Sequence, residues 1–223
     1  ILGAAFFKGS RDAGVLTTAK HFPGHGDTAV DSHGSLPKIN ISEKMLRSRE
    51  LVPFKHLIKE GVPFIMSGHL NFPQILTKGE PATFSKYILN DVLRKEFGFD
   101  GIVITDDIMM YGAITYAGGI AESVRMAFEA GNDIIEASIT PRYTQPFWKD
   151  NLQLLREDPQ FKERIKEAVF RILSVKLKYF KGKNHVPVFP NPDEVNDKLS
   201  DNESRQFFLN LAARSVTVLR GKD

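Results

Sequence analysis

The chain has 223 residues, of which 42% are hydrophobic and 26% charged, and its formal net charge is +3. This length allows one sizeable domain with a buried core, and the composition is ordinary for a soluble globular protein. The small net charge gives no support for nucleic-acid binding, and no apolar run approaches the roughly 20 residues of a membrane-spanning helix. The absence of cysteine excludes disulfides and cysteine-based metal sites but leaves the compartment open.

Short apolar strands and helices are predicted to alternate along the first 137 residues. The predicted strands are 14–19, 62–67, 101–105 and 132–137, and the predicted helices between them are 42–59, 85–97 and 119–130. Ser42 and Ser85 are candidate N-caps, Gly98 and Gly131 end their helices, and Pro53 predicts a kink or break. The strands are apolar on both faces, which is typical of a parallel sheet covered by helices. We therefore predict an α/β fold.

Polar residues stand at the carboxyl end of each predicted strand. They are Lys20 and His21, then His69, then Asp106, and then Glu136. A (β/α)8 barrel has its active site at this face, whereas an open doubly wound sheet binds ligands mostly at one switch point, so four successive strands favour a TIM-like barrel. Only four βα units are present, and eight need roughly 250 residues. The chain is therefore predicted to hold the C-terminal half of a barrel.

The other barrel half is expected from the same protein or from another chain, because an isolated half would leave two bare sheet edges. The chain also starts at Ile1 rather than at a methionine, and we expect it to be part of a longer protein. Further elements are predicted towards the C-terminus: a helix begun by Asp158 and Pro159, a connector at 185–192, a helix at 201–214 and a strand at 215–219. We predict two regions, 1–183 as barrel and 184–223 as a connector and the start of a C-terminal domain.

The run from Lys20 to His33, Lys-His-Phe-Pro-Gly-His-Gly-Asp-Thr-Ala-Val-Asp-Ser-His, is the most informative stretch of the sequence. Its last part places Asp31 two residues before His33, the pairing of carboxylate and imidazole that a histidine acid/base needs. The alternative is a surface loop that is rich in histidine. His21 and His25 do not form a helical metal-binding pair, since a Pro-Gly step lies between them, and we predict no metal and no cofactor.

This run resembles the signature of glycoside hydrolase family 3, in the branch of bacterial β-N-acetylglucosaminidases. Residues 20–28 followed by Asp31-Ser32-His33 match the family motif position by position. The Asp-Ser-His part marks the branch, because the β-glucosidases of the family lack it and use a glutamate from elsewhere. The resemblance implies that His33 is the acid/base, oriented by Asp31, and that Lys20 and His21 bind sugar hydroxyls. His69, which also ends a strand, is a candidate to line the same pocket.

Asp106 and Asp107 follow a buried strand, where two adjacent carboxylates are unfavourable unless they are solvated, paired or used. A helix N-cap is the alternative interpretation. The resemblance implies that Asp106 is the nucleophile, because the family places that residue after a Ser or Thr at this strand end. The family's preceding elements match Leu93, Arg94, Glu96 and Gly101 here. Met109 departs from the family pattern, which has a small or polar residue there, and we expect it to affect pocket shape.

The resemblance implies a retaining exo-β-N-acetylglucosaminidase that acts on muropeptides or related amino-sugar glycosides through an aspartyl glycosyl-enzyme. A neutral histidine does not repel anions as a carboxylate would, so phosphate could replace water as the acceptor. Two rival hypotheses stay open: a β-glucosidase or N-acetylglucosaminide phosphorylase on the same fold, and a non-catalytic fragment or binding module. The aglycone and the oligomeric state also stay open. An extracytoplasmic location, periplasmic or secreted, is favoured over a cytoplasmic one.

Overall fold

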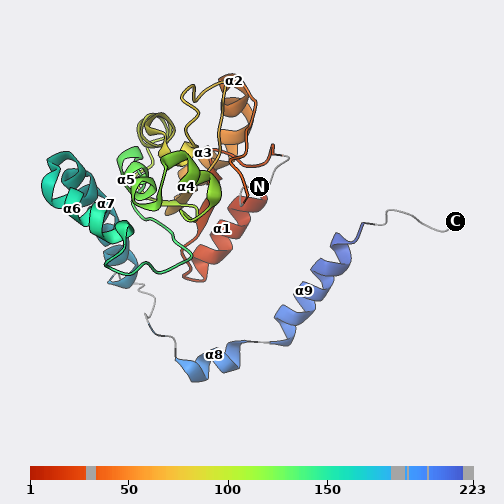
Figure 1. The fold of residues 1–223 in the computed structure, drawn as a ribbon. Helices are drawn as coiled ribbons and strands as arrows, with labels where there is room; N and C mark the ends of the chain where they lie inside the picture. Colours follow the sequence, from red (N-terminus) through yellow and green to blue (C-terminus); the bar gives the residue numbers. More distant parts are fainter. Residues whose placement is uncertain (29–33, 182–188, 190, 200, 218–223) are drawn as a thin grey trace. The chain divides into compact units, whose positions relative to one another are not determined.

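The computed structural model describes residues 1–28, 34–181, 189, 191–199 and 201–217, and Figure 1 shows its elements. The chain divides into two compact units, Ile1–Lys178 and Tyr179–Asp223. The first unit holds the sheet and the predicted site residues that the structure describes. None of the described helices is long and apolar enough to cross a membrane.

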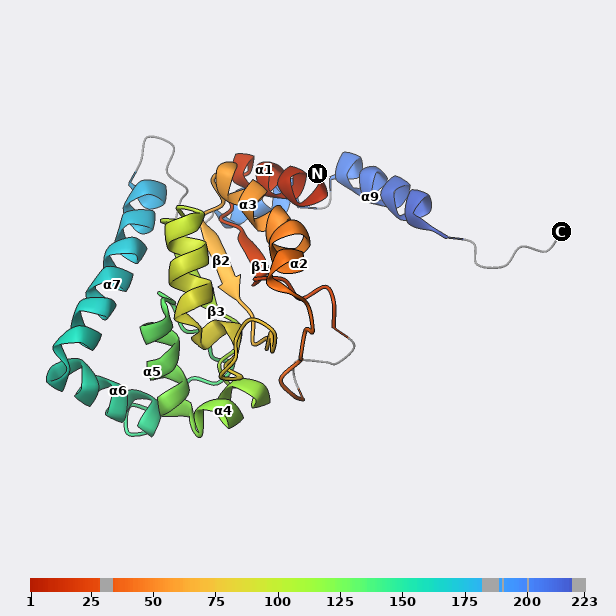
Figure 2. The ribbon, with the colours of Figure 1, turned by 90° about the horizontal axis from the view of Figure 1, so that it is seen from above.

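A three-stranded parallel sheet forms the centre of the first unit (Figure 2). Its strands are β1 (Thr18–Phe22), β2 (Phe64–Ser67) and β3 (Ile102–Thr105), in the order β1-β2-β3. Parallel pairing continues for one bridge beyond β3, from Ile104 to Ile134. The prediction of parallel strands is thus confirmed, while the predicted fourth strand at 132–137 is reduced to this single bridge.

The first strand begins four residues later than predicted, at Thr18–Phe22 instead of 14–19. Lys20 and His21 therefore belong to β1 and do not follow it. The reason is that Ala19 and Phe22 are the buried residues of this segment, so the sheet pairs the polar part of the sequence. Val15, by contrast, is exposed, although its apolar side chain indicates an earlier start of the strand.

Helices connect and follow the strands. They are α1 (Leu2–Asp12) before β1; α2 (Glu43–Met45), the π-helical η1 (Leu46–Glu50) and α3 (Leu51–Lys59) between β1 and β2; and the 3-10 turn η2 (Ala82–Phe84) and the π-helical η3 (Tyr87–Glu96) between β2 and β3. After β3 come α4 (Tyr111–Ala117), α5 (Ile120–Ala130), α6 (Pro146–Glu157) and α7 (Pro159–Phe180). Helix α3 packs on β1 and on α1. The sheet is thus covered by helices, as its apolar strands require.

The two serines predicted as N-caps both bind backbone N–H groups at the start of their helices. Ser42 Oγ accepts a hydrogen bond from the N–H of Met45, and Ser85 Oγ accepts one from the N–H of Ile88. Pro53 does not break its helix, so the break, one of the two predicted effects of this proline, is wrong. It lies in the first turn of α3, directly after the π-helical turn, and proline's missing N–H is tolerated at such a position.

Apolar residues from all three strands meet in the main core. Phe22 of β1, Ile65 of β2 and Val103 of β3 are fully buried there, with helical residues such as Leu46 and Leu89. A second, smaller core joins Phe84, Ile108, Ala113, Val124, Ala127 and Phe147, from the elements around the end of β3. The turn that follows β3 therefore has its own apolar support through Ile108.

A buried charge network ties the helices to the sheet. The Asp133 carboxylate is fully buried and contacts Arg94 at 2.6 Å, Arg164 at 2.7 Å and Arg171 at 3.0 Å. It also accepts a hydrogen bond from the N–H of Val103 in β3. Burial lowers the pKa of Arg94 to about 10, against the opposing effect of Asp133. The network therefore links η3 and α7 to the strand that precedes Asp106.

The second unit contains α8 (Pro192–Lys198) and α9 (Asn202–Ser215). Asn191 and Asp201 cap them by accepting N–H groups of the first turn. The strand expected at 215–219 is not formed in its described part, because Ser215 ends α9 and the next two residues pair with no described strand. Helix α8 is not predicted by the sequence pattern, because its proline-rich start is typical of a connector.

Candidate active site

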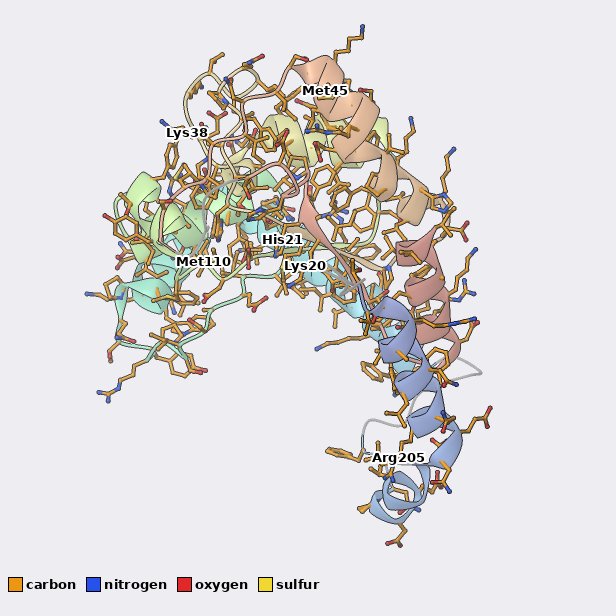
Figure 3. All side chains as sticks on the ribbon, turned by 90° about the vertical axis from the view of Figure 1, so that its right-hand side faces the viewer. Lys20, His21, Lys38, Met45, Met110 and Arg205 are labelled. Carbon is orange, nitrogen blue, oxygen red and sulfur yellow. The ribbon has the colours of Figure 1, made fainter. Side chains whose placement is uncertain are left out.

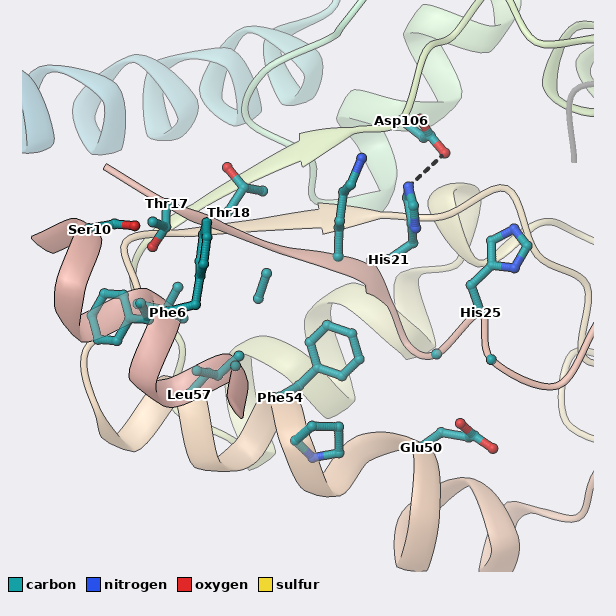
Figure 4. A pocket seen from close by; sticks show the side chains of 18 of the residues that line it. Phe6, Ser10, Thr17, Thr18, His21, His25, Glu50, Phe54, Leu57 and Asp106 are labelled. Atoms are coloured by element: carbon teal, nitrogen blue, oxygen red, sulfur yellow. Dashed lines mark ion pairs between the residues drawn. The ribbon is translucent and has the colours of Figure 1, made fainter. Parts of the chain in front are cut away.

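Because the strands are parallel, the carboxyl ends of β1, β2 and β3 lie at the same end of the sheet. His21 Nε2 and Asp106 Oδ2 lie 3.5 Å apart there, although 85 positions separate them in the chain (21 to 106) (Figure 4). The ladder continues into the site, because the N–H of Asp106 donates to Ser67 O and the N–H of Gly68 donates to Phe22 O. The backbone around both side chains is therefore held by neighbouring strands.

A bulge in β1 presents Lys20 and His21 together. Ala19 pairs with Ile65 and Phe22 pairs with Ser67, so three steps along β1 face two steps along β2. Such an extra residue interrupts the alternation by which neighbouring side chains point to opposite faces of a sheet. Both Lys20 and His21 accordingly line the same pocket, and Figure 3 shows them side by side.

The environment of His21 favours its neutral form. Burial lowers its pKa, the Asp106 carboxylate works in the opposite direction, and the positive charge of Lys20 lowers the pKa further. The distance of 3.5 Å to Asp106 Oδ2 is too long for a strong hydrogen bond. A neutral imidazole in this position can donate to or accept from a hydroxyl of a bound molecule.

The two adjacent aspartates have different surroundings. Asp107 Oδ1 accepts the N–H groups of Met109 and Ser138, both at 3.0 Å. Burial works against its ionisation, but these hydrogen bonds outweigh it and lower the pKa of Asp107. Asp106 Oδ1 accepts the N–H of Asp107 at 2.9 Å, and its Oδ2 faces His21 and the pocket. Asp107 is therefore engaged within the turn, and Asp106 presents its carboxylate to the pocket.

His69 lies behind this turn. His69 is 1% exposed, and its Nε2 atom lies 3.0 Å from the carbonyl oxygen of Asp107. Burial lowers the pKa of His69, against the raising effects of the Asp107 carbonyl and the Asp106 charge. The ring also lies 6.4 Å from that of Phe84. Glu136 follows the bridge partner of β3, as predicted, but its side chain is exposed and does not line the pocket.

The described part of the loop after β1 is held against helix α3 and its π-helical extension. Gly24 has φ 143°, and an added Cβ would lie 2.7 Å from Glu50 Cβ, so only glycine fits there. His25 lies edge-on to His21 with ring centroids 5.5 Å apart, and its Nδ1 is 3.2 Å from Thr28 Oγ1. His25 is thus a brace of the loop.

The predicted acid/base pair, Asp31 and His33, lies outside the described residues. Asp27 precedes this pair by four residues and belongs to the described part of the loop. Its Oδ2 accepts a hydrogen bond from Arg49 at 2.6 Å. Arg49 also donates to Glu50 at 2.5 Å. These contacts connect the loop to η1.

A cavity of about 1220 Å³ opens at these side chains (Figure 4). One end is lined by Lys20, His21, His25, Glu50 and Asp106, and the other by residues of α1 and the start of β1, including Phe6, Ser10, Thr17 and Thr18. The cavity runs along the edge of β1 that pairs with no described strand. No group of three or more His, Cys, Asp or Glu among the described residues is placed to hold a metal ion.

Glu50 is a pocket residue that the sequence motifs do not indicate. Its side chain is only 12% exposed, although it is a carboxylate on a helix. The available signal is its spacing, because Glu50 lies four residues after buried Leu46 and four before buried Phe54. Residues at this spacing share a helix face, so a carboxylate between two core residues indicates a special environment.

Comparisons with known proteins agree on one family. Residues 1–175 match the family model described as the glycosyl hydrolase family 3 N terminal domain. A β-hexosaminidase of Neisseria meningitidis serogroup C (strain 053442) is 40% identical over 157 residues, which are 70% of this chain and 40% of that protein.

Two solved structures extend the similarity to the fold. The glycoside hydrolase family 3 β-N-acetylglucosaminidase from Paenibacillus sp. str. FPU-7 superposes with a TM-score of 0.84 at 35% identity, over 100% of this chain and 41% of its own. A β-glucoside phosphorylase bound to 2FGlc superposes with a TM-score of 0.87 at 26% identity, over 99% of this chain and 40% of its own. The chain therefore spans about two fifths of the length of these relatives.

Proposed function

Because the chain belongs to glycoside hydrolase family 3, we propose that it contributes half of the catalytic barrel of a retaining exo-β-N-acetylglucosaminidase. The observation that carries the proposal is the arrangement at the end of β3. Asp106 presents its carboxylate to a large pocket beside His21, while neighbouring Asp107 is engaged by Met109 and Ser138. A retaining glycosidase needs one such accessible carboxylate as its nucleophile.

In the proposed first step, an Asp106 carboxylate oxygen attacks the anomeric carbon of the bound sugar. The bond from that carbon to the glycosidic oxygen breaks, and the leaving oxygen takes a proton from His33. In the second step, neutral His33 takes a proton from a water molecule, whose oxygen attacks the anomeric carbon and releases Asp106. Asp31 orients the imidazole and stabilises its charged form. The roles of His33 and Asp31 rest on the family motif.

Lys20 and His21 are proposed to bind hydroxyl groups of the sugar. Their shared exposure at the bulge of β1 supports this role, because both side chains reach the pocket that Asp106 lines. Neutral His21 binds a hydroxyl without adding a second positive charge beside the nucleophile. His69 is predicted from the sequence as a third residue of this pocket, and its burial gives that role no support.

The substrate class is proposed from the relatives. Proteins named β-hexosaminidase and β-N-acetylglucosaminidase share 35–40% identity with this chain, which favours a terminal N-acetylglucosamine on a muropeptide or a related amino-sugar glycoside. Such an enzyme would serve peptidoglycan turnover. Phosphorolysis is the second candidate, because a β-glucoside phosphorylase has a closely similar fold.

Further barrel strands are proposed to pack along the free edge of β1. This edge pairs with no described strand, it borders the large cavity, and the matched part of the chain covers only 40–41% of these relatives. An open strand edge of this kind is a template for further pairing. We propose that residues 1–183 belong to the barrel and that 184–223 form a connector and the start of another domain.

The test compares two chromogenic substrates on the full-length protein, nitrophenyl N-acetyl-β-glucosaminide and nitrophenyl β-glucoside, each with and without phosphate. We expect the N-acetyl substrate to be cleaved faster and phosphate to leave the product unchanged. Faster cleavage of the glucoside would indicate a β-glucosidase instead, and a sugar phosphate as the main product would indicate a phosphorylase. No cleavage of either substrate by the wild type, with the Asp106→Asn variant as baseline, would indicate a non-catalytic role.

A further inference from the structure

His69 is buried beside the turn that carries the proposed nucleophile, Asp106. His69 follows β2, the central strand, and so stands between the ends of the strands that carry His21 and Asp106. Its side chain is buried and does not line the large cavity. Its described polar contact is Nε2 to the carbonyl oxygen of Asp107, at 3.0 Å.

This contact determines which nitrogen of His69 carries the proton. A carbonyl oxygen only accepts hydrogen bonds, so Nε2 must be the donor. Burial lowers the pKa of His69 and so favours the neutral ring, in which Nδ1 carries no proton. Nδ1 is buried and has no hydrogen-bond partner among the described residues.

The hydrogen bond from His69 acts on the residue that holds the nucleophile. Asp107 uses its N–H to bind Asp106 Oδ1 at 2.9 Å, and its side chain is fixed by two other N–H groups. The carbonyl oxygen of Asp107 accepts hydrogen bonds from His69 Nε2 and from the N–H of Met110, both at 3.0 Å, and His69 is its side-chain donor. The hydrogen bonds of the Asp107 N–H, carboxylate and carbonyl are therefore all made in the same conformation of the turn. In this conformation Asp106 Oδ2 faces His21.

We propose that His69 is a positioning residue, which holds the Asp107 carbonyl as a neutral Nε2–H donor and thereby orients the Asp106 carboxylate for attack. The inference rests on the proposed nucleophilic role of Asp106. A neutral donor suits this task because a second cation near Asp106, in addition to Lys20, would stabilise the carboxylate and reduce its nucleophilicity.

Three substitutions separate positioning from sugar binding and from simple packing. The amide nitrogen of glutamine is three bonds from Cβ, as is Nε2 of histidine, so His69→Gln keeps a neutral donor near Asp107. His69→Asn places its amide one bond too short, and His69→Phe keeps a ring but has no donor. Phe84→Leu is the matched control, because Phe84 packs against the His69 ring and takes no part in the hydrogen bond.

The variants are compared in the full-length protein with nitrophenyl N-acetyl-β-glucosaminide as substrate and N-acetylglucosamine as a competitive inhibitor. We expect His69→Phe and His69→Asn to lower kcat about 10- to 100-fold, which corresponds to ~1.4–2.7 kcal/mol of transition-state stabilisation. The inhibition constant of N-acetylglucosamine should stay within about twofold of the wild-type value, because the residues proposed to bind the sugar, Lys20 and His21, are unchanged. His69→Gln should recover most of kcat, and Phe84→Leu should lower the melting temperature while keeping kcat.

Several results would overturn the proposal. One is an unchanged kcat in a folded His69→Phe variant, and another is an equal kcat for the His69→Gln and His69→Asn variants. A third is weaker binding of N-acetylglucosamine as the main effect, which would assign His69 to sugar binding. Nitrogen-15 NMR of the wild-type imidazoles provides a test that needs no folded variant, because a proton on Nδ1 of His69 at neutral pH would also refute it. If the wild type cleaves no substrate, the proposed function fails, and the NMR result still decides the tautomer.

Discussion

Replacement of Asp133 by asparagine should destabilise the protein more than any other change of a single charge discussed for this chain. The Asp133 carboxylate is fully buried and lies 2.6–3.0 Å from Arg94, Arg164 and Arg171. Asp133→Asn keeps the shape but removes the negative charge, so the three guanidinium groups repel one another with less compensation. Arg94 suffers most, because burial already lowers its pKa to about 10.

The expected loss follows from the burial of these partners. The side chains of Arg94 and Arg164 are only 11% and 14% exposed, so solvent screens them poorly. Breaking one buried ion pair costs about 3–5 kcal/mol, and we expect Asp133→Asn to lower the free energy of unfolding by about that amount. Because natural domains are stable by only about 5–15 kcal/mol, this is a large fraction. The melting temperature should fall by roughly 6–20 °C.

Urea and thermal unfolding, followed by circular dichroism, measure the change. Asp91→Asn is the matched control, because Asp91 pairs with Lys95 at 2.7 Å but both side chains are at least half exposed. We expect the control to lose less than about 1 kcal/mol. If Asp133→Asn lost no more than this control, the carboxylate would not be the group that compensates the buried arginines, and the reasoning would be refuted.

Three further predictions concern the site. Asp106→Asn should slow glycoside cleavage by several orders of magnitude, about 5 kcal/mol or more, and a fluorinated sugar should label Asp106 in the wild type; labelling of Asp107 with an active Asp106 variant would reverse the assignment. His33→Ala should slow cleavage of a natural sugar aglycone more than that of a nitrophenyl glycoside, with a milder pattern for Asp31→Ala, and equal losses on both substrates would exclude an acid/base role. The lowered pKa of His69 means that the unfolded chain binds its proton first as the pH falls, so stability should drop below about pH 6.5. His69→Gln should flatten this dependence in urea titrations at several pH values, and an unchanged slope would contradict it.

The sequence by itself determined the local features of the fold and the kinds of residue in the site. Ser42, Ser85 and Gly98 predicted helix ends because caps act within a few residues. The apolar runs predicted parallel strands, since burial on both faces requires apolar side chains throughout. The motif that begins at Lys20 and the pair Asp106-Asp107 indicate the family by their sequence alone.

Tertiary structure alone decided the features that depend on partners far apart in the chain. The register of β1 against β2 moved the first strand by four residues and produced the bulge that presents Lys20 and His21 together. The difference between Asp106 and Asp107 depends in part on Ser138, which lies 31 residues after Asp107 and joins Met109 in binding its carboxylate. Such pairings are set by how elements pack, and no local pattern in the sequence carries them.

The network around Asp133 shows the same limit most clearly. Its sequence neighbours predicted only the start of a strand, whereas its three arginines lie 31–39 residues away on two different helices. A buried carboxylate is stable only when opposite charges surround it, and that requirement is met by folding rather than by the adjacent sequence. The sequence thus specified which groups were available, and the packing of η3 and α7 on the sheet decided that they meet.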